Sequence, residues 1–339
     1  MAADNKAGIS AGFFIAMVFD GSTSLQGLHL HDFSIRWLHV TPFLYHYPMS
    51  PYSEKLRLTM GLRGIAWSSI QVSPQPPRGT LDNLLGGYRR IPVLQRGAHF
   101  YCDTRLAFEA LHDDDASATQ LDADDEALRD WAEREIFFAV FSVVSPVKVL
   151  GFLTGQMGLL GVVRFMRDRT HMMRNATLDV LAAERARTAV QDFIAHLGVR
   201  LSTNLYLSGK QPGYLDLCCY HPLWMTCQID PRVASTWPPT VSGWMKRMDA
   251  LEHGEVVPVT WDLALQDIAE NQSVVAGVVA EPYQVGERVG VAPTDYARDE
   301  TAGELVSMDA DRIVMSRILE SGHTIYLHFP RKGFELRRR

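Results

Sequence analysis

Ser50 stands at the start of a predicted helix, a position from which a hydroxyl group can take part in chemistry. Pro51 follows it, and proline suits the first turn of a helix because its missing N–H would have no partner there. The free N–H groups and the dipole of a helix N-terminus stabilise an anion. The pattern therefore predicts Ser50 as a hydrogen-bond donor to an anion, with a plain helix N-cap as the alternative interpretation.

The four cysteines are the candidates for metal or redox chemistry, and their spacing favours neither. Cys102, Cys218, Cys219 and Cys227 form no paired CxxC motif. We therefore expect no disulfide framework and no zinc site, and a reducing cytoplasm suits the chain. The sequence predicts a cytoplasmic protein without a bound metal.

The composition excludes several other classes of protein. Hydrophobic residues make up 47% and charged residues 21% of the 339 residues, which is typical of a folded globular chain. The formal net charge of −6 gives no general attraction to nucleic acid or to an anionic membrane. We therefore predict no nucleic-acid partner and no membrane partner, and this length favours two or three domains.

The elements that must position Ser50 are predicted for residues 41–113. A β-favouring run at 43–47 is followed by helical spacing at 53–62 and by a second strand at 65–72. Two further strands are predicted at 91–94 and 99–101, and a helix begins at Asp103. This order is that of a thioredoxin-like α/β domain.

Three further regions follow from changes of pattern along the chain. Residues 1–40 are predicted to be an N-terminal extension, and their apolar run at 9–19 is shorter than the roughly 20 residues of a membrane span. No other stretch is expected to cross a membrane. Residues 125–275 show helical apolar spacing and predict an all-helical domain. Short strands separated by Gly and Asp in residues 283–336 predict a small all-β domain, an SH3-like barrel.

Four motifs, in this order, resemble the glutathione transferase family. The segment Tyr47–Arg57 resembles the first strand–helix junction of serine-type members with omega-, zeta- or theta-like sequences. Ile91–Leu94 resembles the segment that carries the family's cis proline, and Cys102–Thr104 resembles its acidic-hydroxyl turn. Leu207–Asp216 resembles the capping box of the family's helical domain. The resemblance covers about residues 43–250.

The resemblance implies glutathione as the cosubstrate and assigns residues to it. Ile91, beside Pro92, would pair its backbone with the cysteinyl unit of the peptide. Thr104, at a helix start, would bind the γ-glutamyl carboxylate, and Asp103 would accept from the ammonium group. Arg90, where the family often has Lys or Gln, would approach the glycyl carboxylate. The alternatives are a plain helix cap at Asp103 and an ordinary edge-strand proline at Pro92.

In this resemblance Ser50 takes the place of the residue that activates the thiol. A helix N-terminus lowers the pKa of a thiol from its usual value of about 8.5, and a hydroxyl there can donate to the thiolate. Omega-type relatives carry cysteine at this place, whereas serine at both 50 and 53 favours attack by the bound thiolate over disulfide exchange. Tyr45, Tyr47 and Ser53 are alternative donors to the sulfur.

We therefore expect a glutathione transferase-like enzyme that attacks a small apolar electrophile, and the family implies a homodimer. The alternatives are a glutathione-dependent isomerase or lyase, and a non-catalytic binding or scaffold protein of the same fold. The side chains that could line the electrophile pocket, with burial in an ordinary core as their alternative role, are Trp131, Phe137, Phe138, Phe141, Trp224 and Met225.

Overall fold

The computed structural model describes residues 41–339 except residues 179, 274 and 276, so the predicted N-terminal extension lies outside the described residues. A ten-stranded sheet has the order β10-β6-β7-β8-β9-β4-β3-β1-β2-β5. The strands are β1 (Phe43–His46), β2 (Trp67–Gln71), β3 (Val93–Arg96), β4 (His99–Tyr101), β5 (Val256–Pro258), β6 (Arg288–Pro293), β7 (Thr301–Met308), β8 (Arg312–Ile318), β9 (Thr324–Pro330) and β10 (Phe334–Arg338).

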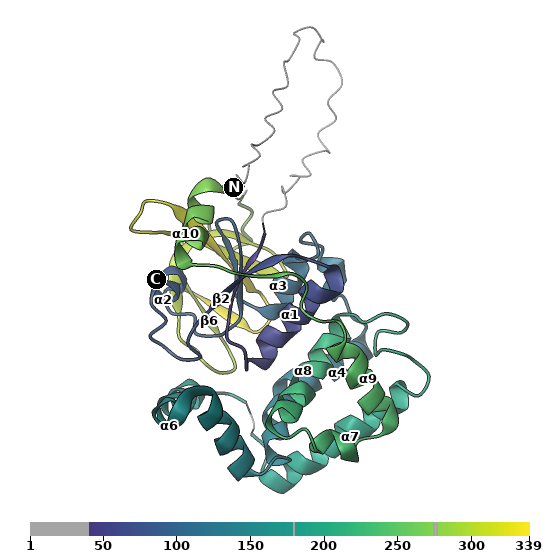
Figure 1. Cartoon of the computed structure of the whole chain (residues 1–339). Coiled ribbons are helices and arrows are strands. Elements are labelled where there is room, and N and C mark those ends of the chain that lie inside the picture. Colours follow the sequence, from purple (N-terminus) through teal and green to yellow (C-terminus); the bar gives the residue numbers. More distant parts are fainter. Residues whose placement is uncertain (1–40, 179, 274, 276) are drawn as a thin grey trace, which may run out of the picture. The chain divides into compact units, whose positions relative to one another are not determined.

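The strands β1 to β4 and three helices form the predicted thioredoxin-like unit, which is thereby confirmed. β1 pairs in parallel with β2 and antiparallel with β3. The helices are α1 (Pro51–Arg63), α2 (Thr80–Leu85) and α3 (Thr104–Ala110). Apolar side chains of α1 and α3 pack in one cluster, whereas those of α2 pack in another with α10 (Trp261–Glu270). The two pairs of helices thus cover opposite faces of the sheet (Figure 1).

Local sequence sets both ends of α1. The Ser50 hydroxyl accepts from the Ser53 N–H at 3.1 Å, and Pro51 occupies the first helical position. Gly64 ends the helix in a left-handed conformation with φ of 60°, which glycine adopts without steric cost. These residues direct the N-terminus of α1 toward the loops that form the candidate site.

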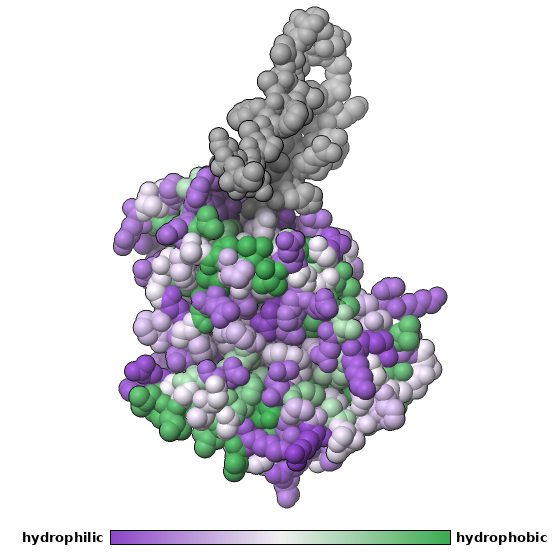
Figure 2. Space-filling view, viewed as in Figure 1, coloured by the Kyte–Doolittle hydropathy of each residue, from purple (hydrophilic) through white to green (hydrophobic). Residues whose placement is uncertain are grey.

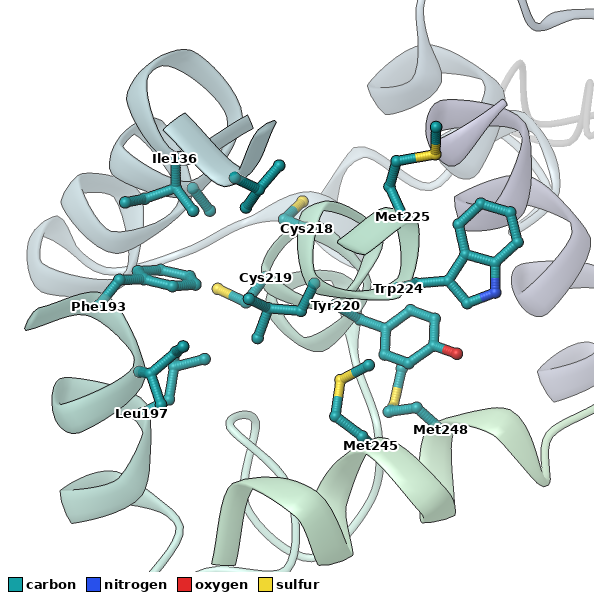
Figure 3. Packing of buried hydrophobic residues seen from close by; sticks show 14 of the residues in the cluster. Ile136, Phe193, Leu197, Cys218, Cys219, Tyr220, Trp224, Met225, Met245 and Met248 are labelled. Carbon is teal, nitrogen blue, oxygen red and sulfur yellow. The ribbon is translucent and has the colours of Figure 1, made fainter. Parts of the chain in front are cut away.

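The helical region predicted for the middle of the chain is also confirmed. Its helices are α4 (Ala123–Asp130), the π-helical η2 (Trp131–Ile136), α5 (Phe137–Ala139), α6 (Pro146–Met173), α7 (Ala183–Arg200), α8 (Tyr214–Ile229) and α9 (Pro239–Asp249). The short 3₁₀ segments are η1 (Ala116–Thr119), η3 (Val140–Ser142) and η4 (Val233–Thr236). Side chains of α8 pack between α7, α9 and η2, with Cys219 facing Phe193 and Tyr220 near Met245 (Figure 3).

Asp216, in the first turn of α8, organises the loop before that helix. Its carboxylate accepts from the Leu207 and Ser208 N–H groups at 2.7 and 3.0 Å, and from the Trp244 indole at 2.8 Å. It also accepts from the Gly213 N–H at 3.1 Å, as the predicted capping box requires. A Cβ at position 213 would lie 2.6 Å from the Ser208 Oγ, which explains glycine at this cap.

The long helix α6 is unusual because much of its apolar surface is exposed. Leu159 and Leu160 are 69% and 76% exposed, and hydrophobic side chains gather over this part of the molecule (Figure 2). Gly158, with φ of 70° and ψ of 168°, interrupts the helical backbone. By length and composition α6 is also apolar enough to cross a membrane, contrary to the sequence-based expectation.

The C-terminal strands extend the thioredoxin-like sheet, so the predicted SH3-like barrel is not confirmed. β9 pairs in parallel with β4, with Tyr326 opposite His99 and His328 opposite Tyr101. Among the described strands, β10 pairs only with β6, and the sheet stays open. The physical reason is that β4 would otherwise be an exposed edge with unpaired N–H and C=O groups, and β9 covers it.

The two parts of the sheet share one apolar core. Tyr88, beside the candidate site, packs its ring 5.7 Å from Phe329 and 6.4 Å from Phe334. The helix α10, predicted within the helical domain, instead buries Ala264 and Ile268 against this sheet. The C-terminal strands therefore lie beside the predicted binding residues and contribute to their surroundings.

Candidate functional site

All five residues predicted to bind the cosubstrate line one polar pocket of about 300 Å³. They come from the loop before β3 and from the start of α3. The residues are Arg90, Ile91, Pro92, Asp103 and Thr104. The structure therefore brings together side chains that the sequence separates by up to fourteen positions.

Ile91 and Pro92 form one wall of the polar pocket. The peptide bond between them is cis, as predicted from the motif. Within the described part of the chain, no hydrogen bond uses the backbone N–H or C=O of Ile91. This backbone is therefore free to pair with an extended peptide.

The turn at the start of α3 forms a second wall. The Asp103 carboxylate caps the helix by accepting from the Arg105 N–H at 2.8 Å. Burial raises the pKa of Asp103, although that N–H works in the opposite direction. The Thr104 hydroxyl accepts from the Lys55 ammonium at 3.2 Å and keeps its own hydrogen for a ligand. The helix cap and the pocket lining are thus both present at this turn.

Arg90 is held by the loop between β6 and β7. Its guanidinium forms an ion pair with Asp295 and donates to the Tyr296 carbonyl at 2.6 Å. It also lies 4.1 Å from the centre of the Tyr296 ring, a cation–π contact. Burial disfavours the charged form, but Tyr296 and Asp295 outweigh it and raise the pKa of Arg90.

Ser50 lines a second cavity of about 510 Å³, which is mainly apolar. The serine is 1% exposed and caps α1, so the alternative role of an N-cap is realised as well. Tyr47 lines the same cavity. Ser53 is fully buried and lines neither the polar pocket nor the apolar cavity. Tyr45 is buried and donates its hydroxyl hydrogen to Gln95.

Aromatic and methionine side chains from the helical region form most of the apolar cavity. Of the six residues considered for it, Phe137, Phe138, Phe141 and Met225 line the cavity, whereas Trp131 and Trp224 do not. Sequence reasoning missed the contribution of α6. Its lining residues are Val149, Phe152, Leu153, Phe165, Met166, Arg169, Met172 and Met173.

The polar pocket and the apolar cavity are neighbours. The residues that line both are Tyr52, Arg90, Ile91, Phe138 and Tyr296. A ligand whose backbone lies along Ile91 can therefore direct a side chain into the cavity that contains Ser50.

Four residues missed by sequence reasoning support the floor of the site. The buried Lys55 ammonium forms an ion pair with Glu133, which lies in the π-helical η2. Tyr52 donates to the Glu133 carbonyl at 3.3 Å, and its ring lies 4.5 Å from the His221 ring. Burial would raise the pKa of Glu133, but Lys55 and His221 together lower it. π-Helical turns often occur at functional sites, but no sequence pattern indicated this one.

Among the residues that the structure describes, no group of three or more His, Cys, Asp and Glu side chains could hold a metal ion. Cys102, near the polar pocket, is fully buried, and burial raises the pKa of its thiol.

Comparison with known families gives a match over the thioredoxin-like unit. Residues 44–117 match the family model of the glutathione S-transferase N-terminal domain. No curated protein matches the chain significantly in sequence.

Solved structures give a longer match. A GST-like protein from Pseudomonas syringae is 25% identical, with a TM-score of 0.69, and the match covers 88% of this chain and 100% of that one. FzlA from C. crescentus is 18% identical, with a TM-score of 0.43 and coverage of 62% of this chain and 88% of that one. A delta-class glutathione transferase from Nilaparvata lugens is 17% identical, with a TM-score of 0.37 and coverage of 63% and 90%.

Proposed function

We propose that this chain is a glutathione transferase-like enzyme that attacks a small apolar electrophile with the glutathione thiolate. The single observation that supports the proposal is that the polar pocket and the apolar cavity adjoin one another. The polar pocket contains the five residues assigned to glutathione, and the adjoining apolar cavity contains Ser50. The match of residues 44–117 supports a glutathione-related function.

The polar pocket suits the peptide part of glutathione. The unpaired backbone of Ile91 would exchange hydrogen bonds with the cysteinyl unit, as an added strand does at a sheet edge. Thr104 would donate to the γ-glutamyl carboxylate, and Asp103 would accept from the ammonium group. In this orientation the thiol points toward the N-terminus of α1 in the apolar cavity.

Ser50 would stabilise the thiolate without losing its own proton. Its oxygen accepts from the Ser53 N–H, and its O–H remains able to donate to sulfur. The dipole of α1 adds further stabilisation to the anion. The thiol proton passes to water, the sulfur forms a bond to an electrophilic carbon, and a leaving group departs with the electron pair of its bond.

The apolar cavity would hold the electrophile. Phe137, Phe138 and Met225 offer it aromatic and thioether surfaces, and about 510 Å³ is within the range of small-molecule sites. Exclusion of water there leaves the thiolate weakly solvated and so more reactive.

Calorimetric titration of the full chain with glutathione tests the proposal. We expect saturable binding that Thr104→Val weakens about tenfold, because a hydrogen bond to a carboxylate is lost. The matched variant Thr203→Val, at an exposed site, should bind as wild type does. Absence of binding would overturn the proposal.

A second measurement separates an enzyme from a binding protein. Conjugation of glutathione to a chlorodinitrobenzene should proceed faster with the protein than without it, and Thr104→Val should raise KM. Binding without any acceleration, across several classes of electrophile, would instead favour the non-catalytic alternative.

A further inference from the structure

The polar pocket contains a carboxylate of the protein itself at the place expected for one carboxylate of glutathione. The Asp295 carboxylate pairs with Arg90, the residue assigned to the glycyl end of the ligand. The side chains of Asp295 and Arg90 are 22% and 16% exposed, so water screens this pair only weakly. Asp295 belongs to the β6–β7 loop and is 205 positions from Arg90 in the sequence.

Backbone hydrogen bonds fix this loop on both sides of Asp295. The Thr294 N–H donates to the Gly333 carbonyl at 3.0 Å, and the Ala297 N–H donates to the Met172 carbonyl at 2.9 Å. The Asp295 carbonyl accepts from the Thr177 N–H at 2.8 Å. The carboxylate is therefore positioned by the turn between β9 and β10 and by the end of α6.

The remaining surroundings of Arg90 reinforce the pair. The Tyr296 carbonyl takes a second hydrogen bond, and the rings of Tyr296 and Phe334 lie 4.1 and 5.9 Å from the guanidinium carbon. A glycyl carboxylate at Arg90 would have to displace Asp295 or lie beside it, and two adjacent carboxylates repel one another.

We propose that Asp295 competes with the glycyl carboxylate for Arg90, so that the site prefers a glutathione-like thiol whose C-terminal end carries no charge. This inference rests on the proposed function, because it assumes that a γ-glutamylcysteinyl thiol binds in the polar pocket. The preferred class comprises glutathione derivatives with an esterified or amidated glycine.

Binding of two probes to the wild-type full chain provides the first test. The glycyl monoethyl ester of glutathione lacks the charge at that end and carries an ethyl group in its place, and the comparison with the variant below separates the two differences. Because the ester avoids the repulsion, we expect it to bind several-fold more tightly than glutathione in a calorimetric titration.

The variant Asp295→Asn provides the second test. It keeps the shape of the side chain and frees the charge of Arg90, so glutathione should bind about tenfold more tightly than to wild type. Binding of the ester should change by less than about twofold, since it makes no ionic contact with Arg90. The matched control Asp299→Asn removes a carboxylate that lies 3.6 Å from Arg89, and it should alter neither affinity.

The outcomes separate this inference from the proposed function. If neither probe binds wild type or Asp295→Asn, the proposed function itself fails. If both bind, but glutathione binds more tightly than the ester and Asp295→Asn leaves that ratio unchanged, the competition is overturned.

Discussion

The buried ammonium of Lys55 in α1 forms an ion pair with the carboxylate of Glu133 in η2, and so joins the thioredoxin-like unit to the helical region. The same ammonium donates to Thr104 at the edge of the polar pocket. One buried pair therefore links the two parts of the fold to the site that lies between them.

The first prediction concerns this pair. Glu133→Gln should lower the free energy of unfolding by about 3 kcal/mol, because it leaves the Lys55 ammonium buried without a counter-charge. Urea unfolding at neutral pH measures the change. Asp124→Asn, at an exposed position in the first turn of α4, should cost less than about 1 kcal/mol. Equal losses in the two variants would contradict the prediction.

The second prediction is a loss of stability in mild acid. The pKa of His46 is lowered to about 3, and the pKa values of His99 and His221 are lowered to about 4. Burial is the largest cause in each case. In the unfolded chain these groups have pKa values of about 6.5. The unfolded state therefore binds more protons below that pH, and stability present above about pH 6.5 is lost as the pH falls toward 4.

The size of this acid effect can be measured. Between pH 6 and pH 5, these three histidines should lower the free energy of unfolding by roughly 3–4 kcal/mol, and His328, whose pKa burial lowers as well, should add to this loss. His221→Phe, which preserves a ring beside Tyr52 and Phe137, should reduce that loss by about 1 kcal/mol. A loss unchanged by this substitution would show that His221 does not contribute.

The third prediction concerns Asp216. Asp216→Ala removes the acceptor of four hydrogen bonds, from Leu207, Ser208, Gly213 and Trp244. We expect a loss of about 3–5 kcal/mol in the free energy of unfolding, because the donors remain partly buried without partners.

The matched control for Asp216 is Asp262→Ala. Asp262 is exposed in the first turn of α10, and its loss should cost less than about 1 kcal/mol. Chemical denaturation of both variants compares them, and a similar cost for the two would show that the network around Asp216 contributes little.

Much of the thioredoxin-like unit could be predicted because its signals are local. Ile91–Pro92 and Asp103–Thr104 are neighbours in sequence, and their backbone environment is set within a few residues. The positions of Ser50 and of the α1 helix cap follow from the same short-range rules. The sequence therefore predicted which residues would gather at the polar pocket.

The remaining parts depend on contacts between distant segments. The presence of strands in the C-terminal region could be predicted, but not that they extend the thioredoxin-like sheet instead of closing into a barrel, because this depends on the pairing of β9 with the edge of β4. The contact of Asp295 with Arg90 has no local signature either. The pairing of β10 with β6 has little local signal as well, because the apolar positions of β10, Phe334 and Leu336, are few among arginines.

The fourth prediction follows from the shared sheet. Because β4 and β9 pair and their side chains share a core, calorimetry of the full chain should show one main unfolding transition. A chain truncated after residue 282 should aggregate, since β4 becomes an open edge. Two separate transitions, with the upper or lower one matching an isolated 283–339 fragment, would contradict the prediction.

The fifth prediction concerns the sulfur donor. Ser50→Ala should raise the pKa of the bound glutathione thiol toward the free value of about 8.5, and lower kcat for conjugation. Ser53→Ala is the matched control, because Ser53 is fully buried in the same helix and lines neither the polar pocket nor the apolar cavity. Tyr47→Phe tests the other hydroxyl of the apolar cavity.

The role of Ser50 is tested most directly by an ultraviolet titration of the thiolate of glutathione bound to the full chain. We predict a thiol pKa clearly below about 8.5 in wild type and in Ser53→Ala, and a value of about 8.5 in Ser50→Ala. The same pKa in wild type and Ser50→Ala, or a rise in Tyr47→Phe instead, would contradict the central role of Ser50.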